Sequence, residues 1–428
     1  MLKYTFFLFT LIQLSLSGHS SELKQRLTRL SDKFDFKITE LKTDTFFEEK
    51  FLIELSQPLD HGEDMSETFT QRIYLSHRGF NNPVVFITEG YAAGYAQNPR
   101  YINELSGILE ANQVCVEHRY FGNSIPKPIE WKYLTIKNAA ADHHQIITIL
   151  SEIYGNKWIS TGISKGGQTA LFHRYFYPDD VDATVGYVCP VNFSKEDKRV
   201  YRFLEQVGDS ITRNKIYAFQ YKLLKDKAKY LAIFRDQTEK KRISFNMSIT
   251  EAFELTVLEY SFAFWQWGMT PVDSIPDTTA SPVQIISHLG KVAGFDWVSE
   301  KGIERMQPFF YQAMLEIGFY GYDITPFQDF VSFKENPGFD FTLPEGIEVH
   351  YDPLPMQQVD CFIRHQADNI LLIYGENDPW SATGAEITWN NDVVKIIKPD
   401  GSHMTRIKNL PETQKELAIS TLKRWLSE

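Results

Sequence analysis

The five residues Gly162-Ile163-Ser164-Lys165-Gly166 constrain the fold of this chain more than any other segment. They match the pattern G-x-S-x-G, with a segment of strand character at 157–161 before them and a helical pattern at 167–176 after them. A sharp strand-to-helix turn holds such a serine above the end of a sheet, and glycine is needed on both sides because Cβ atoms would collide in so tight a turn. The segment therefore predicts that Ser164 is a nucleophile.

Segments of strand character alternate with helical patterns on both sides of Ser164. The expected strands lie at 51–55, 71–75, 83–88, 113–116, 369–374 and 393–397. The runs at 83–88 and 113–116 are continuously apolar, as in parallel strands that are buried on both faces. Helical spacing at 139–154 and a closing helix at 412–426 complete the pattern. This order predicts an α/β fold, the doubly wound and mostly parallel sheet of an α/β-hydrolase.

The middle of the chain lacks this alternation. Residues 195–242 contain 14 Lys or Arg against 7 Asp or Glu on long helical patterns such as Tyr217 to Phe234, and aromatic residues crowd 260–267. Acidic residues interrupt the basic ones, so we interpret this stretch as a solvated helical surface rather than an anion-binding one. The expected organisation is a signal peptide at 1–20, a first hydrolase part at 21–194, a helical cap insertion at 195–360 and a second hydrolase part at 361–428.

A serine hydroxyl is a weak nucleophile, so a base must take its proton and an acid must orient that base. In α/β-hydrolases these partners follow in the chain order Ser, Asp, His. Asp378 and His403 each follow one of the last two expected strands, at the sheet edge where parallel strands end and ligands bind. We therefore predict a triad of Ser164, Asp378 and His403, with Glu376 and Asp400 as alternatives for the acid.

The oxyanion hole of this fold takes two main-chain N–H groups. One belongs to the residue after the nucleophile, and the other belongs to a loop that follows an early strand. We therefore expect Lys165 to supply one donor and the loop of Gly90 and Tyr91 to supply the other.

Three stretches outside the predicted triad carry a specific resemblance. They are 57–61 (QPLDH) followed by 70–74 (TQRIY), 117–126 (EHRYFGNSIP), and 310–312 (FYQ) with 316–319 (EIGF). These stretches resemble secreted serine exopeptidases related to lysosomal prolyl carboxypeptidase and dipeptidyl peptidase II. That family usually has Gly-Ser-Tyr-Gly-Gly at the elbow. The Ser-Lys-Gly-Gly found here is similar to bacterial secreted tripeptidyl aminopeptidases of the prolyl tripeptidyl peptidase type.

The resemblance implies a hydrolase sheet with a helical cap, and release of short peptides from free N-termini, often after proline. An aminopeptidase must also bind the substrate ammonium, which calls for a buried or focused carboxylate. Glu89 and Glu316 are the candidates for this role. In the alternative interpretation Glu89 is a loop carboxylate that pairs with Arg119, and Glu316 belongs to a structural ion pair of the cap.

Composition excludes several other classes of protein. The net charge of −11 argues against a protein that coats nucleic acid. No cluster of His, Asp, Glu or Cys has metal-site spacing and no nucleotide-binding motif occurs, so we expect neither a metal nor a cofactor. The three cysteines Cys115, Cys189 and Cys361 permit at most one disulfide, and Cys115 lies in an apolar run typical of a buried thiol.

The N-terminus has the pattern of a secretory signal peptide. A short positive start at 1–3 precedes a nearly apolar run at 4–16, and small residues follow. The run is too short for a stable membrane span, although an uncleaved anchor remains an alternative. We expect the mature protein to be secreted or periplasmic, without stable membrane insertion and with peptides as its partners.

Together these features predict a secreted serine exopeptidase of the tripeptidyl aminopeptidase type that acts through an acyl-enzyme. Three alternatives remain open. The first is a dipeptidyl peptidase or a prolyl carboxypeptidase-like peptidase. The second is an esterase or lipase on the same fold, and the third is a catalytically inactive hydrolase fold used for binding.

Overall fold

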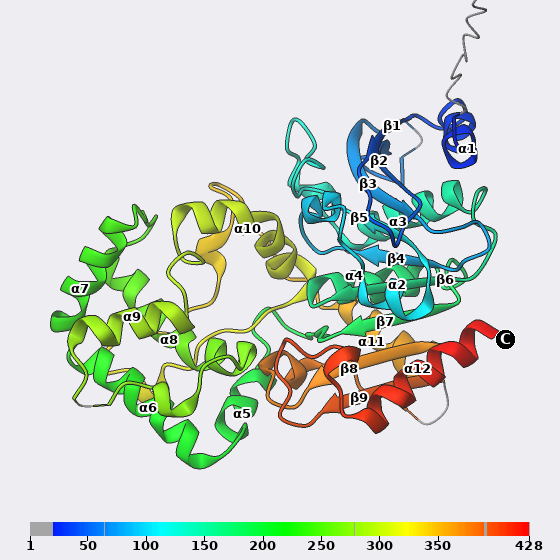
Figure 1. Cartoon of the computed structure of the whole chain (residues 1–428). Coiled ribbons are helices and arrows are strands. Elements are labelled where there is room, and N and C mark those ends of the chain that lie inside the picture. The colour runs from blue at the N-terminus through cyan, green and yellow to red at the C-terminus, as the bar shows by residue number, and fades with distance from the viewer. Residues whose placement is uncertain (1–19, 64, 278, 389–391, 428) are drawn as a thin grey trace, which may run out of the picture.

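The computed structural model describes residues 20–63, 65–277, 279–388 and 392–427 of the 428-residue chain (Figure 1). The expected signal peptide therefore lies almost wholly outside the described residues. Within them no helix is long and apolar enough to cross a membrane. All three cysteines are described and free, with Cys115 and Cys189 buried and Cys361 exposed.

One mixed sheet forms the centre of the right-hand part of the molecule in Figure 1. Its strand order within the described residues is β1-β2-β3-β5-β4-β6-β7-β8-β9. The first three strands and the β3–β5 pair are antiparallel, and every pair from β5 onward is parallel. The strands are β1 (Phe36–Leu41), β2 (Glu49–Pro58), β3 (Thr68–His77), β4 (Val84–Thr88), β5 (Asn112–Val116), β6 (Trp158–Ile163), β7 (Ala183–Tyr187), β8 (Ile370–Gly375) and β9 (Val393–Lys398).

Helices cover both faces of this sheet. The helices beside the sheet are α1 (Glu22–Ser31), α2 (Glu104–Leu109), α3 (Ile136–Leu150), α4 (Lys165–Phe176), α11 (Leu354–His365) and α12 (Glu412–Ser427). Successive strand residues point to opposite faces. Accordingly Leu371 and Ile373 pack in one core cluster with α2 and α12, whereas Ile370 and Leu372 pack in another with α4 and α11. The doubly wound α/β-hydrolase fold predicted from the sequence is confirmed.

The part of the chain between β7 and β8 that carries α5 to α10 forms a helical cap, at the left in Figure 1. Its helices are α5 (Arg199–Gln206), α6 (Ser210–Lys225), α7 (Lys227–Lys240), α8 (Ile249–Trp267), α9 (Pro282–Val292) and α10 (Glu300–Gln312). Apolar residues of the cap belong to the same core cluster as those of α4 and α11, so the cap packs directly on the hydrolase part. The helix expected over Tyr217 to Phe234 is two helices, because Asp226 leaves the helical conformation with φ −98° and ψ 32°.

Candidate active site

Ser164 occupies the sharp turn between β6 and α4, in a backbone conformation with φ 55° and ψ −122°. A side chain at positive φ is strained, and surrounding structure must hold it there. The N–H of Ser164 donates to Tyr187 O at 2.8 Å. A Cβ at Gly162 would lie 2.1 Å from Gly166 O, and a Cβ at Gly166 would lie 2.7 Å from Thr88 O. Both glycines are therefore required by the close approach of three backbone segments.

Asp378 and His403 meet beyond the ends of β8 and β9. The His403 Nδ1 lies 2.7 Å from Asp378 Oδ2, and both side chains are buried. Asp378 Oδ1 also accepts from the N–H of Trp380 at 3.2 Å, which fixes the carboxylate. Glu376 instead accepts from the N–H of Asp400 at 3.0 Å, so neither alternative acid takes the place of Asp378 beside the imidazole. This contact leaves Nε2 of His403 as the nitrogen that can accept a proton.

The loop that carries His403 lies against the end of α8 in the cap. The N–H of His403 donates to Gln266 O at 2.8 Å, and its ring centroid lies 6.0 Å from that of Trp267. Gln266 and Trp267 line the same cavity as Ser164. Among the described residues Ser164 Oγ has no hydrogen-bond partner, so its proton is free for a base that approaches from this side. Catalytic hydrogen bonds of this kind are often loose in the free enzyme and tighten with substrate.

The expected oxyanion donors lie beside Ser164. Tyr91 and Lys165 line the cavity, and within the described chain the main-chain N–H of neither residue has a protein acceptor. Because Gly90 has no side chain, the loop after β4 can approach the start of α4 closely. A Cβ at Gly90 would lie 2.8 Å from the nitrogen of Gly166. The Thr88 hydroxyl donates to Gly166 O at 2.9 Å and holds the loop after β4 against the elbow. Two free N–H groups beside a serine are what a developing oxyanion requires.

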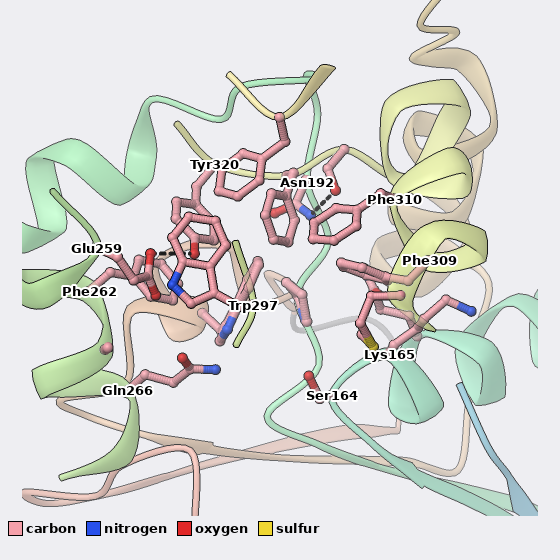
Figure 2. A pocket seen from close by; sticks show the side chains of 18 of the residues that line it. Ser164, Lys165, Asn192, Glu259, Phe262, Gln266, Trp297, Phe309, Phe310 and Tyr320 are labelled. Atoms are coloured by element: carbon pink, nitrogen blue, oxygen red, sulfur yellow. Dashed lines mark hydrogen bonds between the residues drawn. The ribbon is translucent and has the colours of Figure 1, made fainter. Parts of the chain in front are cut away.

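Ser164 lies at the floor of a cavity of about 290 Å³ between the cap and the hydrolase part (Figure 2). Aromatic side chains form about half of its lining. The lining residues include Phe262 from α8, Phe309 and Phe310 from α10, Phe319, Tyr320, Phe339 and Trp380. A cavity of this size and composition takes a short, partly apolar ligand and excludes a folded protein.

The two carboxylates expected to bind an ammonium lie apart from this wall. Of the described residues that line the cavity, none is Glu89 or Glu316. Glu89 is partly buried and accepts from the Tyr95 hydroxyl, while Arg119, its alternative partner, pairs with Asp142 at 2.7 Å. Burial raises the pKa of Glu89, and the Tyr95 hydroxyl and Lys165 oppose that shift.

Glu316 links the cap to the hydrolase part. Its Oε1 accepts from the N–H of Ile136, the first residue of α3, at 2.6 Å. Burial raises the pKa of Glu316 to about 7, although this hydrogen bond opposes the shift. A carboxylate at a helix N-terminus is a common structural contact, so this geometry favours the structural interpretation of Glu316.

The side chain of Lys165 is almost fully buried between these two carboxylates and the nucleophile. Its Nζ lies 3.2 Å from Nε2 of His118, whose Nδ1 faces the Arg119 carbonyl oxygen at 2.7 Å. Burial lowers the pKa of Lys165 to about 7, and the nearby Glu316 and Glu89 oppose that shift.

Glu259 of α8 is a cavity residue that sequence reasoning missed. It is 7% exposed, lines the cavity, and accepts from the hydroxyls of Tyr320 and Tyr322 at 2.9 and 2.7 Å. Burial raises the pKa of its carboxyl to about 7. A weak signal for it exists in the sequence, because Glu259 is the charged residue in a mostly apolar helical run from Leu255 to Phe262.

The sheet order, the strained serine at a strand-to-helix turn and the Asp–His pair beyond the next strands define the chain as an α/β-hydrolase. The family model of the PS-10 peptidases S37 matches residues 19–427. The chain belongs to this family and is a serine peptidase. Within the described residues no group of three or more His, Cys, Asp or Glu could hold a metal ion.

Individual relatives agree with the family match. A prolyl tri/tetrapeptidyl aminopeptidase of Streptomyces mobaraensis is 32% identical over 380 residues, which cover 86% of this chain and 78% of the relative. The lysosomal Pro-X carboxypeptidase of Bos taurus is 26% identical over 154 residues, about a third of each chain. Among solved structures, the proline iminopeptidase of Mycobacterium smegmatis aligns with 87% of this chain and 98% of its own at 14% identity and a TM-score of 0.44.

Proposed function

We propose that this chain is a secreted serine aminopeptidase that releases tripeptides from free N-termini, with proline favoured before the cleaved bond. The observation that carries the proposal is the position of Ser164 at the floor of a small cavity, rich in aromatic residues, between the cap and the hydrolase part. A cavity of this size admits a chain end and excludes internal segments of folded protein. Proline rings pack well on aromatic side chains, and the named activity of the Streptomyces relative supports the same substrate class.

In the proposed reaction Ser164 Oγ attacks the carbonyl carbon of the scissile bond while His403 Nε2 takes the hydroxyl proton. Asp378 holds the imidazole through the 2.7 Å contact and stabilises its positive charge. The N–H groups of Lys165 and of the Tyr91 loop stabilise the oxyanion. As the C–N bond breaks, His403 gives its proton to the leaving amine and an acyl-enzyme remains on Ser164. Water, activated by the same histidine, then releases the peptide acid.

The serine can be tested directly. Ser164→Ala should lower turnover by several orders of magnitude while the protein stays folded, because the hydroxyl forms the covalent intermediate. A fluorophosphonate probe should label wild-type enzyme at Ser164. Labelling at another residue, or near wild-type turnover in the variant, would overturn the assignment.

Substrate class is tested with a panel of four chromogenic compounds. Ala-Ala-Pro-p-nitroanilide should be cleaved faster than Ala-Pro-p-nitroanilide, N-acetyl-Ala-Ala-Pro-p-nitroanilide and a short-chain aryl ester. Preference for the dipeptide would indicate a dipeptidyl peptidase. Preference for the ester would indicate an esterase. Export is tested by N-terminal sequencing of protein recovered from the medium or periplasm, where residues up to about 20 should be missing.

A further inference from the structure

Among the described residues three buried carboxylates, Glu117, Glu259 and Glu316, form no ion pair, and of these only Glu259 lines the cavity. Buried Asp142 pairs with Arg119 and buried Glu254 pairs with Lys227. Within the described chain no Lys, Arg or His side chain forms an ion pair with Glu259. A buried carboxylate without a counter-charge is costly, so such a group is usually neutral or bound to a cation.

The contacts of Glu259 leave one of its oxygens free. Both tyrosine hydroxyls, from Tyr320 and Tyr322, donate to the same atom, Oε2. They fix the carboxylate and leave Oε1 without a hydrogen-bond partner among the described residues. Figure 2 shows Glu259 and Lys165 on opposite sides of the cavity, with Ser164 at its floor. A ligand that extends from Ser164 toward α8 therefore meets an unpaired carboxylate.

The same wall contains further unpaired groups that suit a peptide main chain. Asn192 is 1% exposed, and its Nδ2 donates to the carbonyl oxygens of Ile317 and Gly318 at 3.2 and 3.1 Å. These two bonds orient the amide and leave Oδ1, a buried acceptor, without a partner. The buried Nε1 of Trp297 is likewise a donor without a partner. Both residues line the cavity, and a peptide unit supplies one N–H and one C=O to match them.

We propose that Glu259 binds the α-ammonium of the substrate and so makes the enzyme require a free N-terminus. This inference rests on the proposed aminopeptidase function and names the residue that gives it specificity. Glu89 and Glu316 are less suited to the role, because neither lines the cavity and the charge of Lys165 already acts on each of them. Glu259 supplies charge to the non-reacting end of the substrate, and Ser164 acts at the other end of the bound segment.

The test compares substrates that differ only in the amine. Ala-Ala-Pro-p-nitroanilide and propionyl-Ala-Pro-p-nitroanilide have the same carbon skeleton, but the second lacks the ammonium. Removing one partner of a desolvated charge pair costs about 2–4 kcal/mol of binding free energy. The kcat/KM of the wild-type enzyme should therefore be about 30-fold to 1000-fold higher for the free-amine substrate than for the propionyl substrate. Glu259→Gln should reduce kcat/KM for the free amine and bring the two substrates to within about threefold of each other.

Two further variants control for effects on folding. Glu205→Gln makes the same chemical change at an exposed position of α5 in the same cap and should keep the full wild-type preference. Glu259→Asp keeps the charge but retracts it by one methylene, so it should show an intermediate preference. Labelling of Ser164 by a fluorophosphonate verifies that each variant has a folded, reactive site.

The outcomes separate this inference from the proposed function. If wild-type enzyme prefers the free amine and Glu259→Gln keeps that preference, Glu259 is not the anchor although the aminopeptidase function stands. If wild-type enzyme cleaves both substrates equally, the aminopeptidase function fails and the anchor with it. Loss of preference in Glu259→Gln together with retained Ser164 labelling supports both.

Discussion

The side chain of Lys165 is buried directly beside the nucleophile, although its main-chain N–H is the group expected to serve catalysis. Its Nζ lies 3.2 Å from His118 Nε2, and its ammonium lies over the rings of Tyr91 and Phe121. Burial lowers the pKa of Lys165 to about 7. These contacts surround the loop of Tyr91, so we assign the side chain a role in packing rather than in chemistry.

Replacing this side chain therefore tests whether the oxyanion donor is the main chain. Lys165→Met keeps the apolar stem and the N–H, and should retain kcat for Ala-Ala-Pro-p-nitroanilide within about tenfold of wild type. Steady-state kinetics beside Ser164→Ala provide the comparison. If the two variants lose activity equally, Nζ takes part in the reaction and the main-chain assignment is wrong.

The raised pKa of Glu259 predicts how amine preference depends on pH. Only the ionised carboxylate attracts an ammonium, and burial raises the pKa of Glu259 to about 7 in the free enzyme. The pKa values of Tyr320 and Tyr322, which contact it, are raised well above their usual range by burial, so both stay neutral. A peptide amine loses its proton above about pH 8. Preference for a free amine should therefore fall below pH 7 and again above pH 8.

The measurement is the ratio of kcat/KM for Ala-Ala-Pro-p-nitroanilide and propionyl-Ala-Pro-p-nitroanilide from pH 5.5 to 9.5. Both substrates pass through the same chemical step, so the effect of pH on that step cancels in the ratio. Glu259→Gln should give a ratio that stays flat across this range. A wild-type ratio that is constant with pH would contradict the role of Glu259.

At the scale of elements, the end of α8 contacts the loop that carries His403, the proposed catalytic base. Gly268 ends this helix at φ 59°, and a Cβ there would lie 2.8 Å from Ser402 Cβ. Gln266, two residues earlier, accepts the N–H of His403. The cap therefore contributes to the geometry of the triad as well as to the cavity.

A side chain at Gly268 should disturb this arrangement. Gly268→Ala places a methyl group against the loop of His403, and because small misplacements of catalytic groups are costly, kcat should fall by about 10-fold to 100-fold. Gly346→Ala is the matched control, since Gly346 has φ 74° but nothing within 4 Å of the added Cβ. Both variants should lose about 1–2 kcal/mol of unfolding free energy from the positive φ, measured in urea. Equal activity in the two would refute the coupling.

Elements with a continuous apolar pattern were predictable from the sequence, and those without one were not. The buried strands β4, β5 and β8 follow the expected runs closely. β7 was missed because its five residues, 183–187, include glycine and threonine and carry no distinctive period. β1 alternates weakly because it lies at the edge of the sheet and pairs only with β2 among the described strands. The local hydrophobic pattern of a segment reflects its burial, so short strands and edge strands give only a weak signal in the sequence.

At the scale of the whole molecule, the candidate site combines local and distant parts. The strained Ser164 and the Asp378–His403 pair each follow a strand within a few residues, which is why short motifs predict them. Glu259 meets Tyr320 and Tyr322 more than 60 residues further along the chain, through packing of the cap. No rule based on the spacing of residues in the sequence predicts such a contact. The proposed catalytic residues could therefore be named from the sequence, whereas the cavity wall that we propose selects the substrate could not.

The two-sided wall of the cavity leads to a prediction about the enzyme as a whole. The cavity holds about 290 Å³ and its walls come from both the cap and the hydrolase part, and we expect only a free chain end to reach Ser164. A linear peptide Ala-Ala-Pro-Ala-Ala-Phe should lose Ala-Ala-Pro, whereas the head-to-tail cyclic peptide of the same sequence should be cleaved at least about 1000-fold more slowly, because it lacks both the ammonium and an end that fits. Mass spectrometry of timed digests measures both rates. Linearised product from the cyclic peptide, or internal fragments of a folded protein, would show that the cap opens widely and that the enzyme is an endopeptidase.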